Sequence, residues 1–506
     1  MKSFAFLMTL VASLPLTAQG ANPTDLYQQH CLSCHGEGRM GAMAPALLPQ
    51  SLDRLKPAEV LEAVRDGRPA TQMPGFAGKL SENEIKELTA WLGTPPAVPP
   101  RWSEADTAAS YVRYVDPARL PSKPIFKADP RNLFVVVEAG DHHVTVLDGD
   151  RFTPLARFKS RFALHGGPKF TPDGRFVYFA SRDGWVTQYD LYTLQTVAEI
   201  RVGLNTRNLA VSGDGAWVLA GNTLPETLVL LEAKSLKPVK TFVVHARDGN
   251  PSRVSAVYDA EPRKSFVVAL KDAAELWQIS YDPQAKPKDR RKGQAAISRY
   301  LNPNPSLLDM VLDDFFFDSS YRFLIAASRD GKAEVINLDT QSKVAELELN
   351  GMPHLGSGIT FEQDGHRYMA TPNLNGGRVT VVDMDRWQVV KHIETPGPGY
   401  FLRSHEKTPY AWVDAMMSSR KDTLSIIDKR TLQVVKHLTL RPGKTNAHVE
   451  FTRDGRYALV SIMESPGELV VVDAVTFREI AALPMMKPIG KYNVYNKVTR
   501  SEGTSH

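Results

Sequence analysis

Two cysteines and a histidine lie close together near the N-terminus, as Cys31, Cys34 and, directly after, His35. They are the only two cysteines of the chain, so none remains for a structural disulfide elsewhere. C-x-x-C-H is the attachment motif of c-type haem, because two thiols at this spacing reach the two vinyl groups of one porphyrin and the histidine becomes an axial iron ligand. A chance motif or a disulfide pair is the alternative. The apolar leader at residues 1–20 favours haem, so we expect one covalent haem c bound through Cys31 and Cys34 and ligated by His35.

The iron of this haem needs a sixth ligand. Met73 lies in the sequence Gln-Met-Pro-Gly-Phe, about forty residues after the motif, as in small class I cytochromes c. A thioether ligand would raise the reduction potential. Met40 and Met43 are the competing candidates. We predict Met73 as the ligand, in a domain that carries one electron at a time.

Residues 1–20 contain one lysine, an apolar stretch and small residues at 18–20, a pattern typical of a secretory signal peptide. Ser13, Pro15 and Thr17 interrupt the apolar stretch, and no later segment offers about 20 apolar residues for a membrane span. We therefore expect a periplasmic protein without a membrane span. A net charge of +5 over 506 residues gives no basic footprint, which argues against a nucleic-acid partner.

The segment around the haem motif is predicted to be helical. Leu26, Tyr27 and Cys31 have helical spacing, and Ser81 with Glu84 forms a capping-box pattern. Four prolines in residues 93–102 then predict a stiff, extended linker. The predicted organisation is a signal peptide at 1–20, a class I cytochrome c domain at 21–95, a Pro-rich linker at 96–123 and a second domain at 124–506.

The second domain consists of short β-rich runs that recur. Each unit has an acidic turn, often Asp-Gly, then an apolar run, and then an alternating strand that ends near a threonine-rich turn, as in 170–200. The turns recur about every 47 residues, which is the spacing of propeller blades. The turn positions are Asp129, Asp173, Asp214, Glu261, Asp318, Asp364, Glu406 and Asp454. We predict a small all-α cytochrome c domain followed by an all-β eight-bladed propeller, with seven blades as the alternative because three of the turns are degenerate.

Several segments resemble the cytochrome cd1 nitrite reductase family, and the resemblance covers nearly the whole mature chain. The segments are 31–36, 162–176, 180–184, 202–212, 315–323, 351–358 and 490–496. In that family the propeller binds haem d1 without a covalent bond, which agrees with the absence of a second C-x-x-C-H motif here. The resemblance implies that His165 is the proximal ligand of the d1 iron and that His354 is one of two distal histidines. Asp313 or Asp314 stands where the second distal histidine would be, which weakens an assignment as a nitrite reductase.

Residues 446–457 resemble the dihydro-haem d1 dehydrogenase branch of the family. The resemblance implies a periplasmic oxidoreductase of haem d1 biosynthesis that converts a propionate side chain of dihydro-haem d1 to an acrylate and passes two electrons to haem c. It also implies His448 as an iron ligand, and His354 and Tyr492 as catalytic residues. His354 suits the acid-base role because an imidazole titrates near neutral pH. Whether His165, His448 or both hold the d1 iron stays open.

Three basic residues match carboxylate-binding positions of the reductase: Lys169, Arg182 and Arg207. Any one of them alone could be a solvated surface charge. The resemblance implies a tetrapyrrole substrate, haem d1 or its dihydro precursor, and transient contacts with nitrite reductase and a small electron acceptor protein of open identity. The oligomeric state also stays open.

Two other functions compete with the dehydrogenase. One is a nitrite reductase that forms nitric oxide with an altered distal pocket. The other is a carrier that delivers haem d1 without chemistry, although a pure carrier has no need of haem c.

Three further features are discounted. His142 and His143 are adjacent, and adjacent strand residues point to opposite faces, so the pair is a poor metal chelate. The run 315–317 of three phenylalanines is expected in the core, and 286–294 is read as an exposed basic loop.

Overall fold

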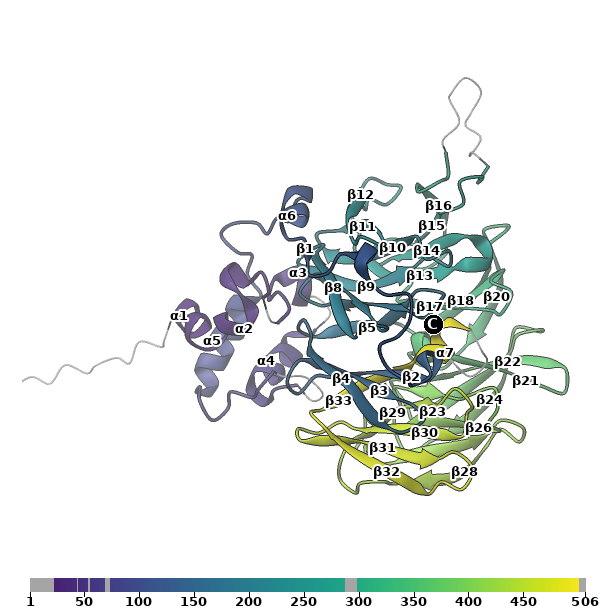
Figure 1. Cartoon of the computed structure of the whole chain (residues 1–506). Helices are drawn as coiled ribbons and strands as arrows, with labels where there is room; N and C mark the ends of the chain where they lie inside the picture. The colour runs from purple at the N-terminus through teal and green to yellow at the C-terminus, as the bar shows by residue number, and fades with distance from the viewer. Residues whose placement is uncertain (1–21, 43, 53–54, 69–72, 287–297, 500–506) are drawn as a thin grey trace, which may run out of the picture.

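The structure is a computed structural model that describes residues 22–42, 44–52, 55–68, 73–286 and 298–499. The predicted signal peptide, Met43 and nearly all of the basic segment 286–294 lie outside the described residues. A group of short helices precedes a ring of four-stranded sheets (Figure 1). In the described part of the chain, no helix has both the length and the apolar character needed to cross a membrane.

The helices predicted between residues 22 and 95 are present. In α5, the Ser81 hydroxyl accepts from the backbone N–H of Glu84 (3.3 Å), and the Glu84 carboxylate accepts from the N–H of Ser81 (2.8 Å), which is the predicted capping box. The same helix buries Ile85, Leu88 and Leu92 on one face against α1 and α4. The α-helices are α1 (Pro23–His30), α2 (Leu32–His35), α3 (Pro49–Leu52), α4 (Pro57–Asp66), α5 (Glu82–Leu92), α6 (Glu104–Ala109) and α7 (Val494–Val498). The 3-10 helices are η1 (Glu37–Arg39), η2 (Pro117–Arg119), η3 (Pro130–Asn132), η4 (Glu261–Arg263) and η5 (Leu355–Ser357).

The segment predicted as a linker, 96–123, is not extended throughout. A second capping box, Ser103 with Asp106, starts α6, and β1 (Val112–Arg113) then pairs with the outer edge of a blade. The Trp102 indole donates to Thr107 Oγ1 (3.0 Å) and the Arg201 carbonyl (3.3 Å). The proline-rich stretch ends at Pro100, and from there local capping and a free strand edge attach the chain to the propeller.

The eight-bladed propeller is confirmed, and each blade has four antiparallel strands, with β1 added to the outer edge of one of them. Seven blades are consecutive in the chain, and the eighth joins β33 to β2, β3 and β4. The first four blades are β33 (Pro488–Asn493), β2 (Leu133–Glu138), β3 (His143–Asp148), β4 (Thr153–Lys159); β5 (Leu164–Phe170), β6 (Phe176–Ser181), β7 (Trp185–Asp190), β8 (Gln195–Arg201); β9 (Asn205–Val211), β10 (Trp217–Leu224), β11 (Thr227–Glu232), β12 (Pro238–Val243); and β13 (Val254–Ala260), β14 (Ser265–Leu270), β15 (Glu275–Ser280), β16 (Pro303–Leu307). The other four are β17 (Asp314–Phe317), β18 (Phe323–Ala327), β19 (Lys332–Asn337), β20 (Ser342–Glu348); β21 (Ile359–Gln363), β22 (His366–Pro372), β23 (Arg378–Asp383), β24 (Gln388–Glu394); β25 (Leu402–Arg403), β26 (Tyr410–Asp414), β27 (Leu424–Asp428), β28 (Gln433–Leu438); and β29 (Asn446–Phe451), β30 (Tyr457–Ile462), β31 (Gly467–Asp473), β32 (Glu479–Met485).

The first strands of the blades line the propeller axis. Contacts join β5 to β9, β9 to β13, β13 to β17, β25 to β29, and β33 to both β29 and β5. Seven of the eight turn positions predicted from the sequence lie between the first and second strands of a blade, and the eighth, Asp129, lies just before β2 in the blade that β33 completes. In two of these turns, Ser212 Oγ donates to Asp214 (2.6 Å) and Thr452 Oγ1 donates to Asp454 (2.7 Å), so the repeated residues form the same local hydrogen bonds.

The C-terminal strand β33 closes the ring by pairing with β2, with Tyr492 opposite Val135. This pairing leaves no open inner edge between the first and last blades. The last described helix, α7, contacts β2, β5 and β33 near the centre of the ring (Figure 1).

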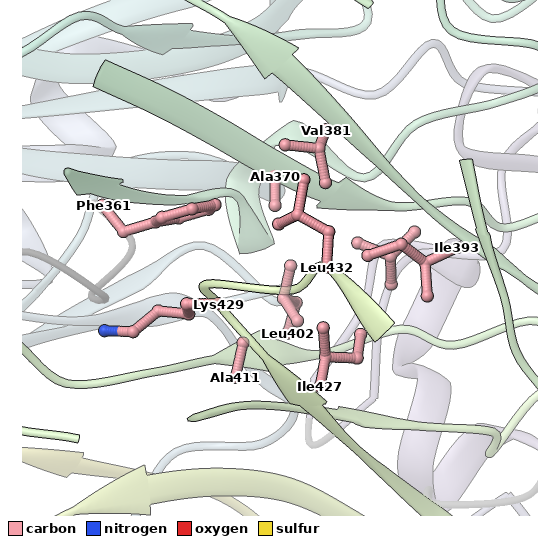
Figure 2. Close-up of a pocket in the computed structure, with 10 residues that line it drawn as sticks. Phe361, Ala370, Val381, Ile393, Leu402, Ala411, Ile427, Lys429 and Leu432 are labelled. Carbon is pink, nitrogen blue, oxygen red and sulfur yellow. The ribbon is translucent and has the colours of Figure 1, made fainter. Parts of the chain in front are cut away.

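Aliphatic side chains fill the space between neighbouring blades. Figure 2 shows Leu402, Ala411 and Ile427 facing Ala370 and Val381 across the gap between two blades, and the space left among them is about 10 Å³. A volume of this size is a packing defect rather than a ligand site. The three phenylalanines of 315–317 are also buried, as predicted.

Candidate functional site

Cys31, Cys34 and His35 lie where α1 meets α2. Both cysteines are free thiols, and the His35 ring is buried, with Nδ1 donating to the carbonyl of Pro45 (2.7 Å). Burial lowers the pKa of His35, so the ring is neutral and Nε2 keeps a lone pair. A neutral, oriented imidazole beside two free thiols fits covalent haem c with His35 as an axial ligand.

The candidate sixth ligands lie in different places. Met73 packs against the apolar cluster of the helical domain that contains Cys31. Met40 packs instead in a second cluster, with Leu48 of the helical domain and Leu204 of the propeller. Met43 lies outside the described residues. Of the two methionines that the structure describes among the candidates, Met73 is the one that packs against the cluster containing a haem-attaching cysteine.

The helical domain contacts the propeller where β9 begins. Arg201 Nη2 donates to the carbonyl groups of Met40 (3.3 Å) and Gly41 (3.5 Å), and the guanidinium lies over the Trp102 ring, 4.7 Å from its centroid. Figure 1 shows the helices beside the sheet that contains β1, β5 and β8. The helical domain therefore contacts the blades that carry His165 and Arg207.

A group of polar and aromatic side chains converges on the axis, and we call it the axial cluster. Its members come from the first strands of seven blades or the loops beside them, and several are partly exposed although they lie inside a ring of sheets. Solvent therefore reaches this end of the axis. The axial cluster comprises His165, Lys169, Arg182, Arg207, Tyr258, Asp314, His354, Tyr400, Phe401, Arg403, His448, Lys491 and Tyr492.

His165, on β5, is held by two arginines. Its Nδ1 donates to the carbonyl of Arg207 (2.7 Å), while Arg182 Nη2 (2.9 Å) and Arg207 Nη1 (3.2 Å) donate to its Nε2. A guanidinium has no acceptor, so Nε2 must carry a lone pair. The structure thus brings together His165, Arg182 and Arg207, which span 42 positions in the sequence. It also gives His165 the tautomer that an iron ligand needs.

His354 precedes η5 and has the same tautomer. Its Nδ1 donates to the carbonyl of Tyr400 (2.6 Å), and the two rings lie 4.1 Å apart between centroids. The surrounding protein lowers the pKa of His354 to about 4, first through desolvation and then through the charges of Arg403 and Arg207. At neutral pH the ring therefore offers a free Nε2 lone pair as a base.

Asp314 is one of the two residues predicted at the place of the missing distal histidine. It accepts from the Tyr258 hydroxyl (2.9 Å) and from the backbone N–H of Gly356 (3.0 Å), so it ties β17 to the loop that carries His354. Burial raises the pKa of Asp314, and the charge of Arg207 opposes this effect. Asp313 lies beside it and borders a groove of about 480 Å³.

His448 and Tyr492 lie on β29 and β33 with rings 5.2 Å apart. His448 is 1% exposed, and its Nε2 has no hydrogen-bond partner among the described residues. Burial raises the pKa of Tyr492 to about 12, so the phenol is neutral. Gly167 has a φ of +68°, and a Cβ there would lie 3.1 Å from the Tyr492 ring, so glycine at this bulge leaves room for the tyrosine.

Several charged members of the axial cluster were missed by the sequence reasoning. Arg403 is 3% exposed and its Nε has no hydrogen-bond partner among the described residues, and Lys491 is 0% exposed. Arg403 lies on β25, just before a blade turn, and Lys491 lies on the closing strand β33. An alignment of the repeated units would have marked both positions. Lys169, which was predicted, has its pKa lowered to about 8 by desolvation, with the carboxylate of Asp314 acting against the shift.

Two matches with protein families divide the chain in the same way as the elements do. Residues 128–497 match the family described as cytochrome D1 heme domain, and residues 18–92 match the family described as cytochrome C oxidase, cbb3-type, subunit III. A curated protein of Pseudomonas aeruginosa named dihydro-heme d1 dehydrogenase is 55% identical over 482 residues, which cover 95% of each chain. This chain belongs to the dihydro-heme d1 dehydrogenase family.

A solved structure supports this family assignment. The structure described as dihydro-heme d1 dehydrogenase NirN in complex with DHE has a TM-score of 0.84 and 54% identity, and the match covers 94% of this chain and 100% of that one. A nitrite reductase of Stutzerimonas stutzeri is 24% identical, with coverage of 93% of this chain and 92% of that protein. The resemblance to the cytochrome cd1 family is thus confirmed, and the dehydrogenase branch is the better match of the two.

The sequence analysis treated His142 and His143 as adjacent residues on one strand, and the structure differs from this interpretation. His142 has a φ of +58° and precedes β3, so the two residues are not adjacent on a strand as assumed. His143 Nδ1 donates to the carbonyl of Asp141 (2.9 Å), and the His142 ring packs on Phe162 at 4.7 Å. Both rings have structural contacts.

Proposed function

We propose that this chain dehydrogenates a propionate side chain of dihydro-haem d1 to the acrylate of haem d1, with two electrons leaving through haem c. The observation that carries the proposal is the axial cluster itself, in which base, cation and phenol groups converge beside the contact with the haem-attaching domain. In the reaction, two C–H bonds of the side chain break, one C=C π bond forms, and two protons and two electrons leave.

The binding step uses the cations of the axial cluster. Arg182, Arg207 and Lys169 lie on or beside β5 and β9 and would pair with carboxylates of the tetrapyrrole substrate. In this structure the two guanidinium groups donate to His165 Nε2 and occupy its lone pair, and they would turn to the substrate carboxylates when an iron takes that position. We assign the substrate iron to His165.

The proton step uses His354 and Tyr492. The Tyr400 carbonyl fixes the His354 ring, so that Nε2 can take a proton from a side-chain carbon next to the macrocycle. The low pKa of His354 keeps the base free at neutral pH. Tyr492 stays a neutral phenol and would donate a hydrogen bond to the substrate carboxylate.

Haem c, when bound at Cys31, Cys34 and His35, supplies a one-electron acceptor. We propose Met73 as its sixth ligand, since it packs against the apolar cluster that contains Cys31. The contact through Arg201 fixes this domain against the axial cluster. A small electron acceptor protein would then remove the electrons one at a time.

The domain organisation and location are proposals of the same kind. The boundaries 21–95, 96–123 and 124–506 are supported by the family matches at 18–92 and 128–497. The leader at 1–20 supports export to the periplasm, where the product would be handed to nitrite reductase.

A nitrite reductase activity is the second candidate, because a related nitrite reductase spans nearly the whole chain. The hydrogen bonds of Asp314 to Tyr258 and Gly356 argue against it, since a carboxylate replaces the second proton-donating imidazole.

The deciding experiment loads the haem c-containing protein with the dihydro precursor and follows its mass and the haem c spectrum. We expect the loss of two hydrogens with reduction of haem c. His354→Ala should abolish this conversion and leave haem c attached, whereas His437→Ala on the exposed strand β28 is the matched control. A tetrapyrrole of unchanged mass would refute the dehydrogenase and favour a carrier, and nitrite turnover to nitric oxide would favour the reductase.

A further inference from the structure

A groove of about 480 Å³ lies beside the axial cluster, where the fourth blade meets the fifth. It is lined by the segment that precedes β17 and by the hairpins β14–β15 and β18–β19. Asp313 forms part of its wall, with a side chain that is 17% exposed. Arg329 also lines the groove, and its Nε lies 3.7 Å from Asp313 Oδ1. Solvent in the groove therefore reaches the Asp313 carboxylate.

Asp313 also lies near His354. The strand β17, which begins directly after Asp313, packs against η5, the turn that follows His354. Desolvation is the main cause that lowers the pKa of His354, and the negative charge of Asp313 acts in the opposite direction. The Asp313 carboxylate is thus close enough for its charge to act on the imidazole ring.

The neighbouring Asp314 has a different role, because hydrogen bonds fix both of its oxygens. Oδ1 accepts from the Tyr258 hydroxyl (2.9 Å) and from the N–H of Phe315 (2.9 Å), and Oδ2 accepts from the N–H of Gly356 (3.0 Å). These bonds tie β17 to Tyr258 and to the loop that carries His354. Of the two carboxylates predicted at the place of the missing distal histidine, Asp313 is the one that borders the groove.

The proposed reaction releases protons inside the axial cluster, and His354 must lose the proton it has taken before the next turnover. The pKa of His354 is about 4, so its protonated ring is about as acidic as an ordinary carboxylic acid. Transfer of the proton to a nearby carboxylate therefore costs little free energy. A macrocycle that lies over the axial cluster would cover the end of the axis that solvent reaches, whereas the groove offers an exit at the side.

We propose that Asp313 is a proton relay between His354 and the solvent in the groove, an assignment that rests on the proposed function. The Nε2–H bond of the protonated imidazole breaks, and an O–H bond forms on the Asp313 carboxylate, directly or through one water molecule. The carboxylic acid then gives the same proton to water in the groove, so both side chains return to their starting states. A carboxylate at this position suits a dehydrogenation, because the protons have to be taken away from the substrate.

Chemical rescue tests the relay in the full, haem c-containing chain. Asp313→Asn keeps the size of the side chain but removes its proton-accepting oxygen. We expect single-turnover reduction of haem c by the dihydro precursor to slow by about ten- to hundred-fold in dilute buffer, the lower end of what a positioned proton-transfer group contributes. Added acetate should restore most of the rate, because a small carboxylate can enter the groove and carry the proton instead.

Asp309→Asn is the matched control. The Asp309 carboxylate lines the same groove, but it is 65% exposed and forms an ion pair with Lys343 (2.9 Å). Its replacement removes the same charge from the groove and should leave the rate unchanged with or without acetate. Asp313→Glu should keep most of the rate without acetate, because it retains a carboxylate.

Two outcomes of the rescue experiment would overturn the relay. One is a rate in Asp313→Asn equal to that of the unaltered protein in dilute buffer. The other is a slow variant that acetate does not restore, because a purely structural role gives no rescue. If Asp313→Asn does not fold, as judged by its thermal unfolding and haem c spectrum, the same comparison is made with Asp313→Ala, which leaves more room for acetate.

A second readout needs no turnover. In the substrate-free, haem c-reduced full chain labelled with ¹⁵N-histidine, NMR follows the titration of His354, with the signals assigned by their loss in His354→Gln. Asp313→Asn should lower the pKa of His354, because it removes a negative charge that favours the protonated ring, whereas Asp309→Asn should not. An unchanged titration in Asp313→Asn would contradict the relay.

Failure of the relay and failure of the proposed function give different results. Normal loss of two hydrogens from the precursor in Asp313→Asn would refute the relay alone. If the unaltered protein removes no hydrogens from the precursor, the proposed function and the relay both fail, and a shifted His354 titration would leave only the electrostatic coupling of Asp313 to His354.

Discussion

The pH profile of kcat/KM tests whether His354 is the base. The surrounding protein lowers the pKa of His354 to about 4. With that pKa, more than about nine tenths of the rings are free at pH 5.5, whereas an ordinary histidine with a pKa of about 6.5 would be only about one tenth free. We therefore expect kcat/KM to stay nearly constant between pH 7 and 5.5, where an unshifted base would lose about tenfold, and to fall only toward pH 4.

The assay follows haem c reduction at low precursor concentration, because kcat/KM reports the free enzyme. Arg403→Gln removes a positive charge that lowers the His354 pKa, so its acid limb should move to higher pH. Asp414→Asn is the matched control, because this carboxyl has its pKa raised to about 6 by burial and accepts from the N–H groups of Tyr400 and Phe401. An acid limb near pH 6.5 in the unaltered protein, or a limb that disappears in Asp414→Asn, would refute the assignment.

Three further predictions concern the domain contact, a glycine and acid stability. Arg201→Gln removes the guanidinium that donates to two carbonyl groups of the helical domain. We expect stopped-flow measurements to show haem c reduction slowed several-fold, with unchanged affinity for the precursor. An unchanged rate would show that the contact does not position the domain. Gly167→Ala places a Cβ at positive φ against the Tyr492 ring, so a denaturant titration should show a free energy of unfolding lower by about 1–3 kcal/mol. Gly249→Ala is the control, because this glycine also has a positive φ but lies in open space, and its free energy of unfolding should fall by less. Burial lowers the pKa values of several histidines, so the unfolded chain binds more protons below about pH 6.5 and the free energy of unfolding should fall as the pH decreases from there, which a series of denaturant titrations can check. These histidines are His35, His354, His405 and His448.

The parts of the fold that the sequence predicted well are those governed by short-range chemistry. The capping box of α5 and the eight blade turns each depend on residues within a few positions of one another. The docking of residues 103–113 depends on the free edge of β8, and the left-handed turn at His142 depends on its neighbours in space. Local propensity shows neither of these features. The sequence therefore predicted an extended linker at residues 96–123 and a strand at His142 and His143.

The candidate site divides in the same way. His165, Arg182 and Arg207 were found through resemblance, and the structure adds that both arginines donate to the histidine. Arg403 and Lys491 were missed because a charged residue in a strand is expected at the surface.

The sequence by itself determined the haem-attaching motif, the blade repeat and the types of residue available at the axis, because each of these follows from residue identity and spacing. Only the tertiary structure decided which of these residues meet and in which protonation state. His165 and His354 are chemically identical in the sequence, and each donates through Nδ1 to a backbone carbonyl, yet the Nε2 of His165 accepts from two arginines, whereas His354 lies in surroundings that lower its pKa to about 4. The reason is physical: a tautomer is set by the hydrogen-bond partner of the ring, and that partner comes from another part of the chain through the closing of the ring of blades.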